Sequence, residues 1–292
     1  MIKNSKSGNI LLSSIPTGAA AYLRNQTPKR TYMKVSIITV SYNSSKTICQ
    51  TIDSVLSQDY PNLEYILVDG NSTDGTKQIL QSYYSHKLRY ISEIDSGIYD
   101  AMNKGIKMSS GDIIGIINAD DFYTHGQVLS QVVAAFQTQG VDGVYGDLVY
   151  VQADEPGKII RYWKSGEYKQ NSFLQGWMPP HPTFFVKREI YEKYNAFDTR
   201  LKSAADYELM LRFIHKYKIS VAYIPQVLVS MRTGGVSNAS LKNRVRANLE
   251  DRLAWKLNRL TPNSLTLLLK PIRKIEQYFS SYNPNIREKI YQ

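Results

Sequence analysis

Two adjacent carboxylates, Asp120 and Asp121, follow a short apolar run in the middle of the chain. The run, residues 112–118, is rich in isoleucine and too short to cross a bilayer, which predicts a buried strand of a parallel sheet. Ligand sites of such sheets lie at the carboxyl ends of the strands, where both carboxylates fall. Neighbouring carboxylates repel each other, and a divalent cation that bridges substrate phosphates relieves this repulsion. The alternative is that both residues cap the following turn, since aspartate favours such positions.

Strand and helix alternate four times in the first part of the chain, with acid or hydroxyl side chains where the strands end. The strands before the acidic pair are predicted at residues 35–43, 64–69 and 88–93. Helices are predicted from about residue 46 to 57, from about residue 76, and from residue 98 to about 107. This alternation predicts an α/β fold, a doubly wound sheet with one polar rim.

Several motifs resemble, in order and spacing, those of the family 2 glycosyltransferases with the GT-A fold. They are residues 36–43 (SIITVSYN), 68–76 (VDGNSTDGT), 118–121 (NADD), 181–185 (HPTFF) and 204–212 (AADYELMLR). Residues 92–105 resemble a bacterial subgroup associated with surface polysaccharides of the colanic acid, O-antigen or capsule type. The resemblance covers about residues 33–240 and implies an inverting, metal-dependent glycosyltransferase with a mixed, mostly parallel sheet flanked by helices.

The resemblance also implies how the donor is bound. The nucleoside would lie against Thr39, Ser41 and Tyr42, although Tyr42 also suits a packing role at the rim. By the same resemblance, Asp69 would contact the base, and Asp95 would contact the nucleotide or the sugar. Asp120 would bind the ribose and Asp121 the metal ion, and Asp120 is also a second candidate metal ligand. Because these ligands are all oxygen atoms, Mn²⁺ or Mg²⁺ is the expected ion.

Asp206 occupies the position of the family's catalytic aspartate, just before a predicted amphipathic helix at residues 207–215. A carboxylate there can take the proton of an attacking hydroxyl. The alternative is a purely structural role, since an acid in the first turn of a helix interacts favourably with the helix dipole. Candidate diphosphate or acceptor contacts are Lys104, Trp177, His181 and Arg232.

The charge of the chain is concentrated at its ends. The net charge is +11, and Lys and Arg minus Asp and Glu gives +6 for residues 1–34, −2 for residues 35–240 and +7 for residues 241–292. We therefore expect a basic leader with little order at residues 1–32 and no secretory signal. The GT-A domain is expected at residues 33–240, with a nucleotide-sugar half (33–121) and an acceptor half (122–240). Residues 241–292 form a basic, amphipathic helical region in this interpretation.

The expected partners follow from this charge distribution and from the resemblance. Cations interspersed with Trp and Leu at residues 241–292 favour anionic lipid over nucleic acid, with a helical pair packed on the core as the alternative. A single cysteine, Cys49, suits a reducing cytoplasm. We expect a cytoplasmic enzyme, peripheral at the inner face of the membrane, that uses a nucleotide-diphosphate sugar, UDP-sugar by preference, and a glycan or lipid-pyrophosphate-linked acceptor.

Other functional classes fit less well. The stretch at residues 70–77 resembles a phosphate-binding P-loop, but its lysine falls one residue late and Asp74 would repel phosphate. A dinucleotide oxidoreductase lacks support because no G-x-G-x-x-G follows the first strand. A nucleotidyltransferase and a non-catalytic sugar-nucleotide-binding protein remain as alternatives, and an acid at position 206 favours the transferase over a pure binder.

Overall fold

The computed structural model describes residues 32–83, 88–234 and 241–263, together with residues 266, 269, 270, 272, 273 and 277. Of residues 241–245 it describes the backbone alone. Residues 33–292 form one compact unit, which contains all of the elements below. The predicted leader, apart from Tyr32, and the last fifteen residues lie outside the described part of the chain.

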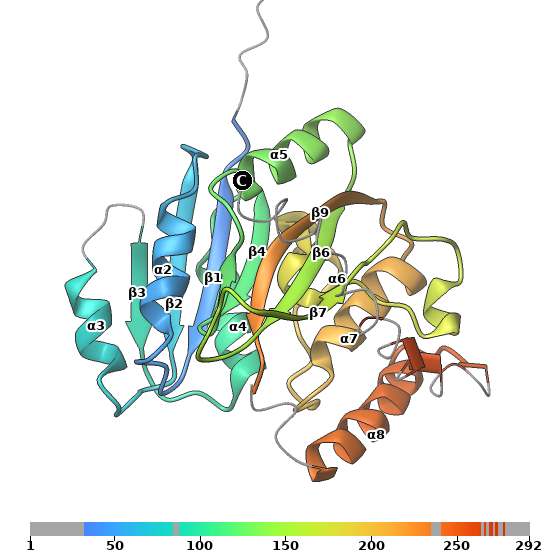
Figure 1. Cartoon of the computed structure of the whole chain (residues 1–292). Helices are drawn as coiled ribbons and strands as arrows, with labels where there is room; N and C mark the ends of the chain where they lie inside the picture. Colours follow the sequence, from blue (N-terminus) through green and yellow to red (C-terminus); the bar gives the residue numbers. More distant parts are fainter. Residues whose placement is uncertain are drawn as a thin grey trace, which may run out of the picture. The chain divides into compact units, whose positions relative to one another are not determined.

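Nine strands among the described residues form one mixed sheet in the order β3-β2-β1-β4-β8-β6-β9-β5, with β7 paired to β6 (Figure 1). Their bounds are β1 Val35–Ser41, β2 Leu63–Asp69, β3 Leu88–Ser92, β4 Ile113–Asn118, β5 Asp121–Tyr123, β6 Gly143–Val151, β7 Ile159–Trp163, β8 Phe185–Lys187 and β9 Val221–Arg232. The predicted α/β class and the GT-A type of sheet are confirmed.

The parallel half of the sheet brings its strand ends together. β1 pairs in parallel with β2 and with β4, and β2 pairs in parallel with β3. In this register Ser41 lies beside Asp69, and Asp69 lies beside Ser92. Four of the predicted donor-site segments therefore end at one edge, as expected for parallel strands joined by helices.

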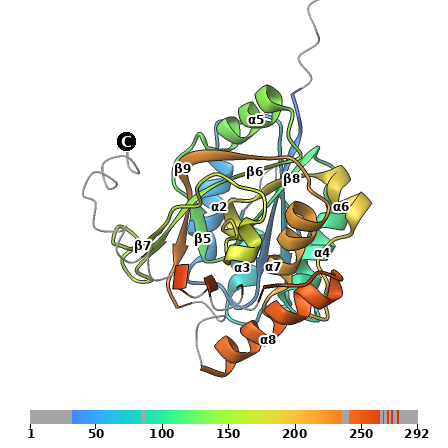
Figure 2. The same ribbon diagram turned by 90° about the vertical axis from the view of Figure 1, so that its right-hand side faces the viewer.

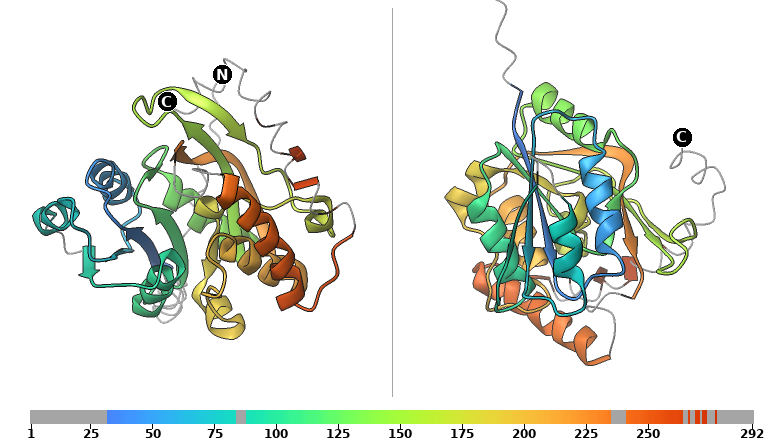
Figure 3. Two further views of the ribbon diagram at one scale, coloured as in Figure 1. Left: turned by 90° about the horizontal axis from the view of Figure 1, so that it is seen from below. Right: turned by 90° about the vertical axis from the view of Figure 1, so that its left-hand side faces the viewer.

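Helices cover both faces of this half (Figures 1 and 3). Alternate residues of β1 enter different cores: Ile38 packs in the core that includes α4, and Ile37 packs in the core that includes α2 and α5. Because a strand alternates its side chains, a strand that is buried along its whole length, as β1 is, needs a covered sheet on both sides. The helices are α2 Ile48–Leu56, α3 Thr76–Ser82, α4 Ile98–Met108, α5 Val128–Gln139, α6 Arg188–Tyr194, α7 Ala205–Met210 and α8 Leu241–Leu257.

The region after residue 200 differs in detail from the prediction. The helix expected at residues 207–215 is a short α-helix, α7, followed by a π-helix, η3 (Leu211–Lys216), so Asp206 lies inside the first turn rather than before it. Short 3₁₀ turns occur at η1 (Ser172–Gln175) and η2 (His181–Thr183). α8 packs against α7 (Figure 2), and Trp255 is buried in the same core as Ile38. Within the described ranges, every helix is too short or too polar to cross a membrane.

Candidate active site

The acidic pair lies where β4 ends and β5 begins. Asp121 is fully buried, and its Oδ2 accepts a hydrogen bond from Nδ2 of Asn118 at 3.0 Å. Its Oδ1 and the Oδ1 of Asn118 are also buried, and neither has a hydrogen-bond partner among the described residues. Buried oxygens without partners are costly. Two such oxygens on contacting side chains, next to Asp120, make a set of oxygen donors that fits a hard divalent cation.

Electrostatics at this pair also favour an added positive charge. Burial raises the pKa of Asp121 well above its usual range, and the neighbouring Asp120 raises it further. Burial raises the pKa of Asp120 as well, while the guanidinium of Arg232 lowers both. Arg232 donates a hydrogen bond to the backbone oxygen of Asp120 at 2.6 Å and another to Oε1 of Gln50. The predicted contact Arg232 therefore does lie beside the acids, and it offsets part of their repulsion.

Asp69 ties together the ends of three strands. Its Oδ1 accepts hydrogen bonds from the hydroxyls of Ser41 at 3.0 Å and Ser72 at 2.5 Å. Its Oδ2 accepts bonds from the hydroxyl of Ser92 at 2.6 Å and the backbone N–H of Ser72 at 3.0 Å. The carboxylate is fully buried. In this conformation Asp69 and Ser41 hold the rim in place, and direct contact of either with a nucleotide remains a prediction.

Tyr42, Gly70 and Asp95 form an open surface at the same edge. Tyr42 is 66% exposed, and Oδ1 of Asp95 accepts a hydrogen bond from the backbone N–H of Gly97 at 2.9 Å. A Cβ atom at Gly70 would lie 2.6 Å from Oδ2 of Asp95 and 3.3 Å from the ring of Tyr42. Any larger residue at position 70 would therefore displace the carboxylate. An aromatic face beside a carboxylate and bare backbone suits a flat base and a ribose hydroxyl.

Two predicted contact residues serve the protein itself. Thr39 is fully buried on β1, where its hydroxyl accepts a hydrogen bond from the hydroxyl of Tyr65 at 3.0 Å. Lys104 forms an ion pair with Glu93 at 2.8 Å and donates to the backbone oxygen of Ile94 at 3.0 Å. Lys104 thus braces the loop that carries Asp95 instead of facing the acidic pair as a free cation.

Asp206 is held by an aromatic cluster. The hydroxyl of Tyr99 donates a hydrogen bond to its Oδ1 at 3.1 Å. Burial, together with the charge of Asp206, raises the pKa of Tyr99 well above its usual range, so Tyr99 stays a donor. Phe197 stacks on Tyr99 and meets His181 edge to face, each at 5.5 Å between ring centroids. Burial lowers the pKa of His181 more than Asp206 raises it, which keeps that imidazole neutral.

The segment before α7 is fixed by α8. Oε2 of Glu250 accepts hydrogen bonds from three consecutive backbone N–H groups, those of residues 202–204, over 2.7–3.0 Å. Nε1 of Trp255 donates to the hydroxyl of Tyr207 at 2.9 Å. Asp206 lies between these two anchors, so the orientation of its helix depends on α8.

Trp177 lies apart from this carboxylate in a second aromatic group. It is buried, and its Nε1 donates to the backbone oxygen of Ser165 at 2.8 Å. Its ring packs edge to face against Tyr145 and Phe173. Part of Trp177 lines a separate pocket, which is described below.

Comparison with known proteins gives the family of the chain. The family model described as "Glycosyl transferase family 2" matches residues 36–195, which is more than half of the chain. The chain belongs to glycosyl transferase family 2. The match includes the rim of the sheet and the acidic pair, and it ends before Asp206.

Curated relatives of this family 2 glycosyltransferase are described as uncharacterized glycosyltransferases. The chain is 31% identical over 181 residues to an uncharacterized glycosyltransferase of Mycobacterium tuberculosis, covering 61% of this chain and 68% of the relative. It is 29% identical over 201 residues to an uncharacterized glycosyltransferase of Rickettsia bellii, covering 67% of this chain. It spans only 29% of the length of the Rickettsia protein.

Solved structures share the fold of this glycosyltransferase. Staphylococcus aureus TarS 1–349 in complex with UDP-GlcNAc has a TM-score of 0.60 at 17% identity, over 85% of this chain and 73% of that one. The mannosyltransferase PcManGT of Pyrobaculum calidifontis, in complex with GDP-Man and Mn²⁺, has a TM-score of 0.56 at 21% identity, over 93% of this chain and 79% of that one. At these identities the likeness concerns the fold.

Sequence reasoning missed two residues that shape the site of this glycosyltransferase. Tyr99 lies 107 positions from Asp206, the residue it bonds, and Glu250 lies 46 positions from Ala204. No local pattern reports such contacts. The one available signal for Tyr99 was its place in the segment 92–105, which resembles the subgroup.

Proposed function

We propose that this glycosyltransferase moves a sugar from a nucleoside diphosphate donor, UDP-sugar by preference, to a hydroxyl group of a glycan, with inversion at the anomeric carbon. The observation that carries the proposal is the state of Asp206. One of its oxygens is held by Tyr99 at 3.1 Å, which fixes the carboxylate and leaves Oδ2 for a substrate proton. Among the described residues, no hydrogen bond or ion pair engages Oδ2 of this half-buried side chain.

The donor would bind along the rim formed by Tyr42, Asp95 and the acidic pair. Mn²⁺ or Mg²⁺ would be held by Asp121, with Asn118 and Asp120 as further oxygen donors, and would supply positive charge to the leaving diphosphate. Arg232 adds a fixed guanidinium beside the pair. The two solved neighbours bind sugar nucleotides with different bases, UDP-GlcNAc and GDP-Man, so the base is a matter for experiment.

The proton has a defined route in this proposal. As the acceptor oxygen attacks the anomeric carbon, its proton passes to Oδ2 of Asp206, and the bond between that carbon and the diphosphate breaks. A single displacement of this kind needs one base and inverts the carbon. The charge of Asp206 acts on the pKa of the neutral His181 nearby, and Phe197 packs against both His181 and Tyr99.

Replacing Asp206 by Asn tests this role, because the substitution keeps the shape of the side chain and removes the proton acceptor. We expect turnover to fall by about 10²–10⁴-fold, the usual value of a general base. Donor affinity, measured by calorimetry with UDP and GDP sugars in the presence of Mn²⁺, should stay the same. Undiminished turnover in Asp206→Asn would rule out the base, and lost donor binding would mean that the residue is structural.

The acceptor is proposed to be a lipid-pyrophosphate-linked glycan of cell-surface polysaccharide synthesis, met at the membrane surface. α8 supports this with an exposed face that joins two leucines to cations. Leu249 is 62% exposed and Leu253 is 38% exposed. The exposed cations around them are Arg246, Arg252, Lys256 and Arg259. A face of this composition suits the headgroup region of an anionic bilayer.

A further inference from the structure

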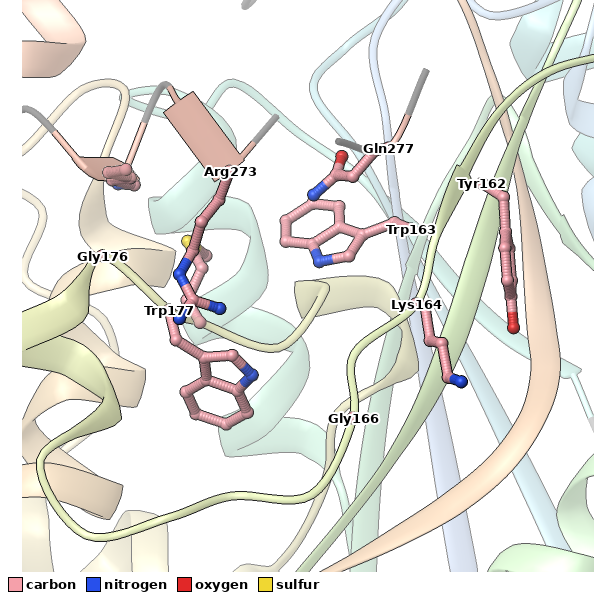
Figure 4. Close-up of a pocket in the computed structure, with 10 residues that line it drawn as sticks. Tyr162, Trp163, Lys164, Gly166, Gly176, Trp177, Arg273 and Gln277 are labelled. Carbon is pink, nitrogen blue, oxygen red and sulfur yellow. The ribbon is translucent and has the colours of Figure 1, made fainter. Parts of the chain in front are cut away.

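A second pocket, of about 280 Å³, lies between β7, the Trp177 loop and the C-terminal segment (Figure 4). Trp163 and Lys164 come from the strand end, Trp177 from the loop, and Arg273 and Gln277 from the segment after α8. The volume is at the lower end for small-molecule sites, so the pocket suits one saccharide unit better than a whole nucleotide sugar.

The floor of the pocket is rigid. Trp177 is fixed by its hydrogen bond to Ser165 and by rings packed on several sides. The backbone of Lys270 approaches Gly176 so closely that a Cβ atom there would lie 2.4 Å from its nitrogen. The backbone at residues 269–270 is therefore seated against the loop, and the ring of Trp177 is held in place by the protein itself.

The lining combines aromatic faces with three cations, which differ in their ion pairs among the described residues. Lys270 forms an ion pair with Asp251, in which Nζ lies 2.7 Å from each carboxylate oxygen. In contrast, Lys164 and Arg273 form no ion pair within the described parts of the chain. Arg273 uses its Nε to donate to the backbone oxygen of Gln175 at 2.9 Å, which orients the guanidinium and leaves its two terminal nitrogens.

Asp147, the carboxylate whose pKa responds to Lys164, is also occupied. It accepts hydrogen bonds from the hydroxyls of Tyr162 and Tyr223 and from the backbone N–H of Ser165. The pocket thus presents two cations and the side chain of Gln277, whose buried Oε1 has no hydrogen-bond partner among the described residues.

We propose that this pocket binds a negatively charged saccharide unit of the acceptor. The electron-rich faces of Trp163 and Trp177 attract the C–H groups of a sugar ring, and Lys164 and Arg273 bind its anion, a carboxylate or a phosphate. The role as an acceptor subsite rests on the proposed function. The pocket adjoins the catalytic helix, because Phe173 contacts both Trp177 and Tyr207, the residue after Asp206.

Intrinsic fluorescence of the full chain reads this pocket directly, since two of the three tryptophans line it and the third, Trp255, is buried elsewhere. The probes are glucose 1-phosphate, glucuronic acid, glucose and inorganic phosphate, each titrated without donor. We expect a saturable change with at least one of the two anionic sugars, at concentrations at least tenfold below those needed for glucose or phosphate alone. Binding of glucose 1-phosphate would indicate that the pocket prefers a phosphate, and binding of glucuronic acid that it prefers a carboxylate.

Single substitutions assign the binding to this pocket. Lys164→Ala and Arg273→Ala should each weaken binding of the anionic sugar about fivefold to tenfold, as expected for loss of a charge-assisted hydrogen bond. Lys169→Ala, an exposed lysine five residues away that does not line the pocket, is the matched control and should leave binding unchanged. Glucose binding as tightly as the anionic sugars, equal weakening by Lys169→Ala, or no saturable change with any probe would overturn the assignment.

The test separates this inference from the proposed function. Asp206→Asn should leave the fluorescence titration as it is in the wild type, because the carboxylate does not line the pocket. If no donor sugar is transferred and anionic sugars still bind, the transferase proposal fails and the pocket stands. If transfer occurs but its rate and acceptor KM are unaffected by Lys164→Ala, the pocket is not an acceptor subsite.

Discussion

Asp121 is buried next to a second carboxylate, an arrangement that costs stability in the absence of a cation. One oxygen of Asp121 has no hydrogen-bond partner among the described residues, and this burial beside Asp120 disfavours the charged form of Asp121. A cation would relieve this, but the metal-free protein bears the repulsion. Residues that hold such strain in a native fold are usually found at functional sites.

Asp121→Asn should therefore stabilise the metal-free protein and abolish its response to metal. If the buried charge destabilises the folded protein by about 1 kcal/mol, its removal would raise Tm by about 2–4 °C in a domain of this size. Mn²⁺ should raise Tm in the wild type, since a ligand of the native state stabilises it, and should leave the variant unchanged. Thermal unfolding with Mn²⁺ or with a chelator measures both effects, and the exposed Asp154→Asn serves as control. A Mn²⁺ response that survives in Asp121→Asn would contradict the metal role.

Tyr99→Phe tests whether the orientation of Asp206 matters separately from its charge. The substitution keeps the ring that stacks on Phe197 and removes only the hydrogen bond to Oδ1. We expect kcat to fall about tenfold, which corresponds to an activation free energy higher by about 1.4 kcal/mol because the base is less well oriented. The donor KM should stay unchanged. Steady-state kinetics provide the measurement, with the buried Tyr191→Phe on α6 as the matched control. A rise in donor KM with unaltered kcat would assign Tyr99 to donor binding instead.

At the scale of elements, the two ends of the parallel strands have different tasks. The carboxyl ends carry the site, and the amino ends are held by Glu64 at the start of β2. Its carboxylate accepts hydrogen bonds from the hydroxyl of Ser36 at 2.6 Å and from the backbone N–H and hydroxyl of Ser110 at 2.8 Å. Lys34 and Arg89 pair with it at 3.2 and 3.3 Å. Although burial alone would raise its pKa, these bonds lower the pKa of Glu64 to about 2.

The lowered pKa has a defined consequence for stability. The ionised form is favoured in the folded state, so its contribution is present above the ordinary pKa of 4.5 and is lost as the pH falls through about 2. Glu64→Gln should lower the free energy of unfolding at pH 7 by about 2–3 kcal/mol, and the difference from wild type should shrink between pH 4.5 and 2. Urea unfolding across this range tests it, with the exposed Glu155→Gln as control. A constant difference at all pH values would show that shape rather than charge matters at position 64.

The parallel half of the sheet was predictable from the sequence because its signals are local. β1, β2 and β4 are runs rich in apolar residues that end in polar residues, and the observed bounds differ from the predicted ones by at most two residues. In β9 the local strand pattern covers only residues 227–231, since Pro225 and the polar residues near it obscure the first half of the strand. Two further features depend on tertiary packing, which no local sequence pattern predicts. They are the change from α7 to a π-helix and the pairing of β6 with β9.

The same division holds for the site. Asp120, Asp121 and Asp95 lie at strand ends, so their position at the rim followed from the sequence and the resemblance. The hydrogen bond of Thr39 and the ion pair of Lys104 within the protein could not be foreseen, because a strand-end hydroxyl and a helical lysine look the same whether they face a ligand or a neighbour. Thr39 is hydrogen-bonded to Tyr65 and Lys104 is ion-paired with Glu93, and only the folded structure shows these partners.

At the scale of the whole molecule, α8 packs on the protein core with one face and exposes the other to solvent. Its inner face holds α7 through Glu250 and Trp255, and Asn258, just after α8, donates to Oε1 of Glu208 at 2.9 Å. Its outer face carries the leucines and cations described above. Deleting residues 241–292 would remove the support of α7 and the proposed lipid-binding face together, so loss of activity on deletion would say nothing about lipid. Substitutions confined to the outer face separate the two.

The double variants Arg252→Gln/Lys256→Gln and Leu249→Ser/Leu253→Ser should weaken binding to vesicles that contain phosphatidylglycerol, and leave transfer to a water-soluble acceptor unchanged. Each cation near an anionic surface is worth about 1 kcal/mol, so the first variant should lose about 10- to 30-fold in vesicle affinity. Added salt should weaken the wild type and affect that variant less. Lys107→Gln/Lys169→Gln, which removes two exposed lysines from other elements, is the charge-matched control. Sedimentation with vesicles measures all four proteins. Equal losses in the control would mean that net charge alone drives binding, and unchanged binding in both α8 variants would leave this helix as an anchor for Asp206 with no part in meeting the membrane.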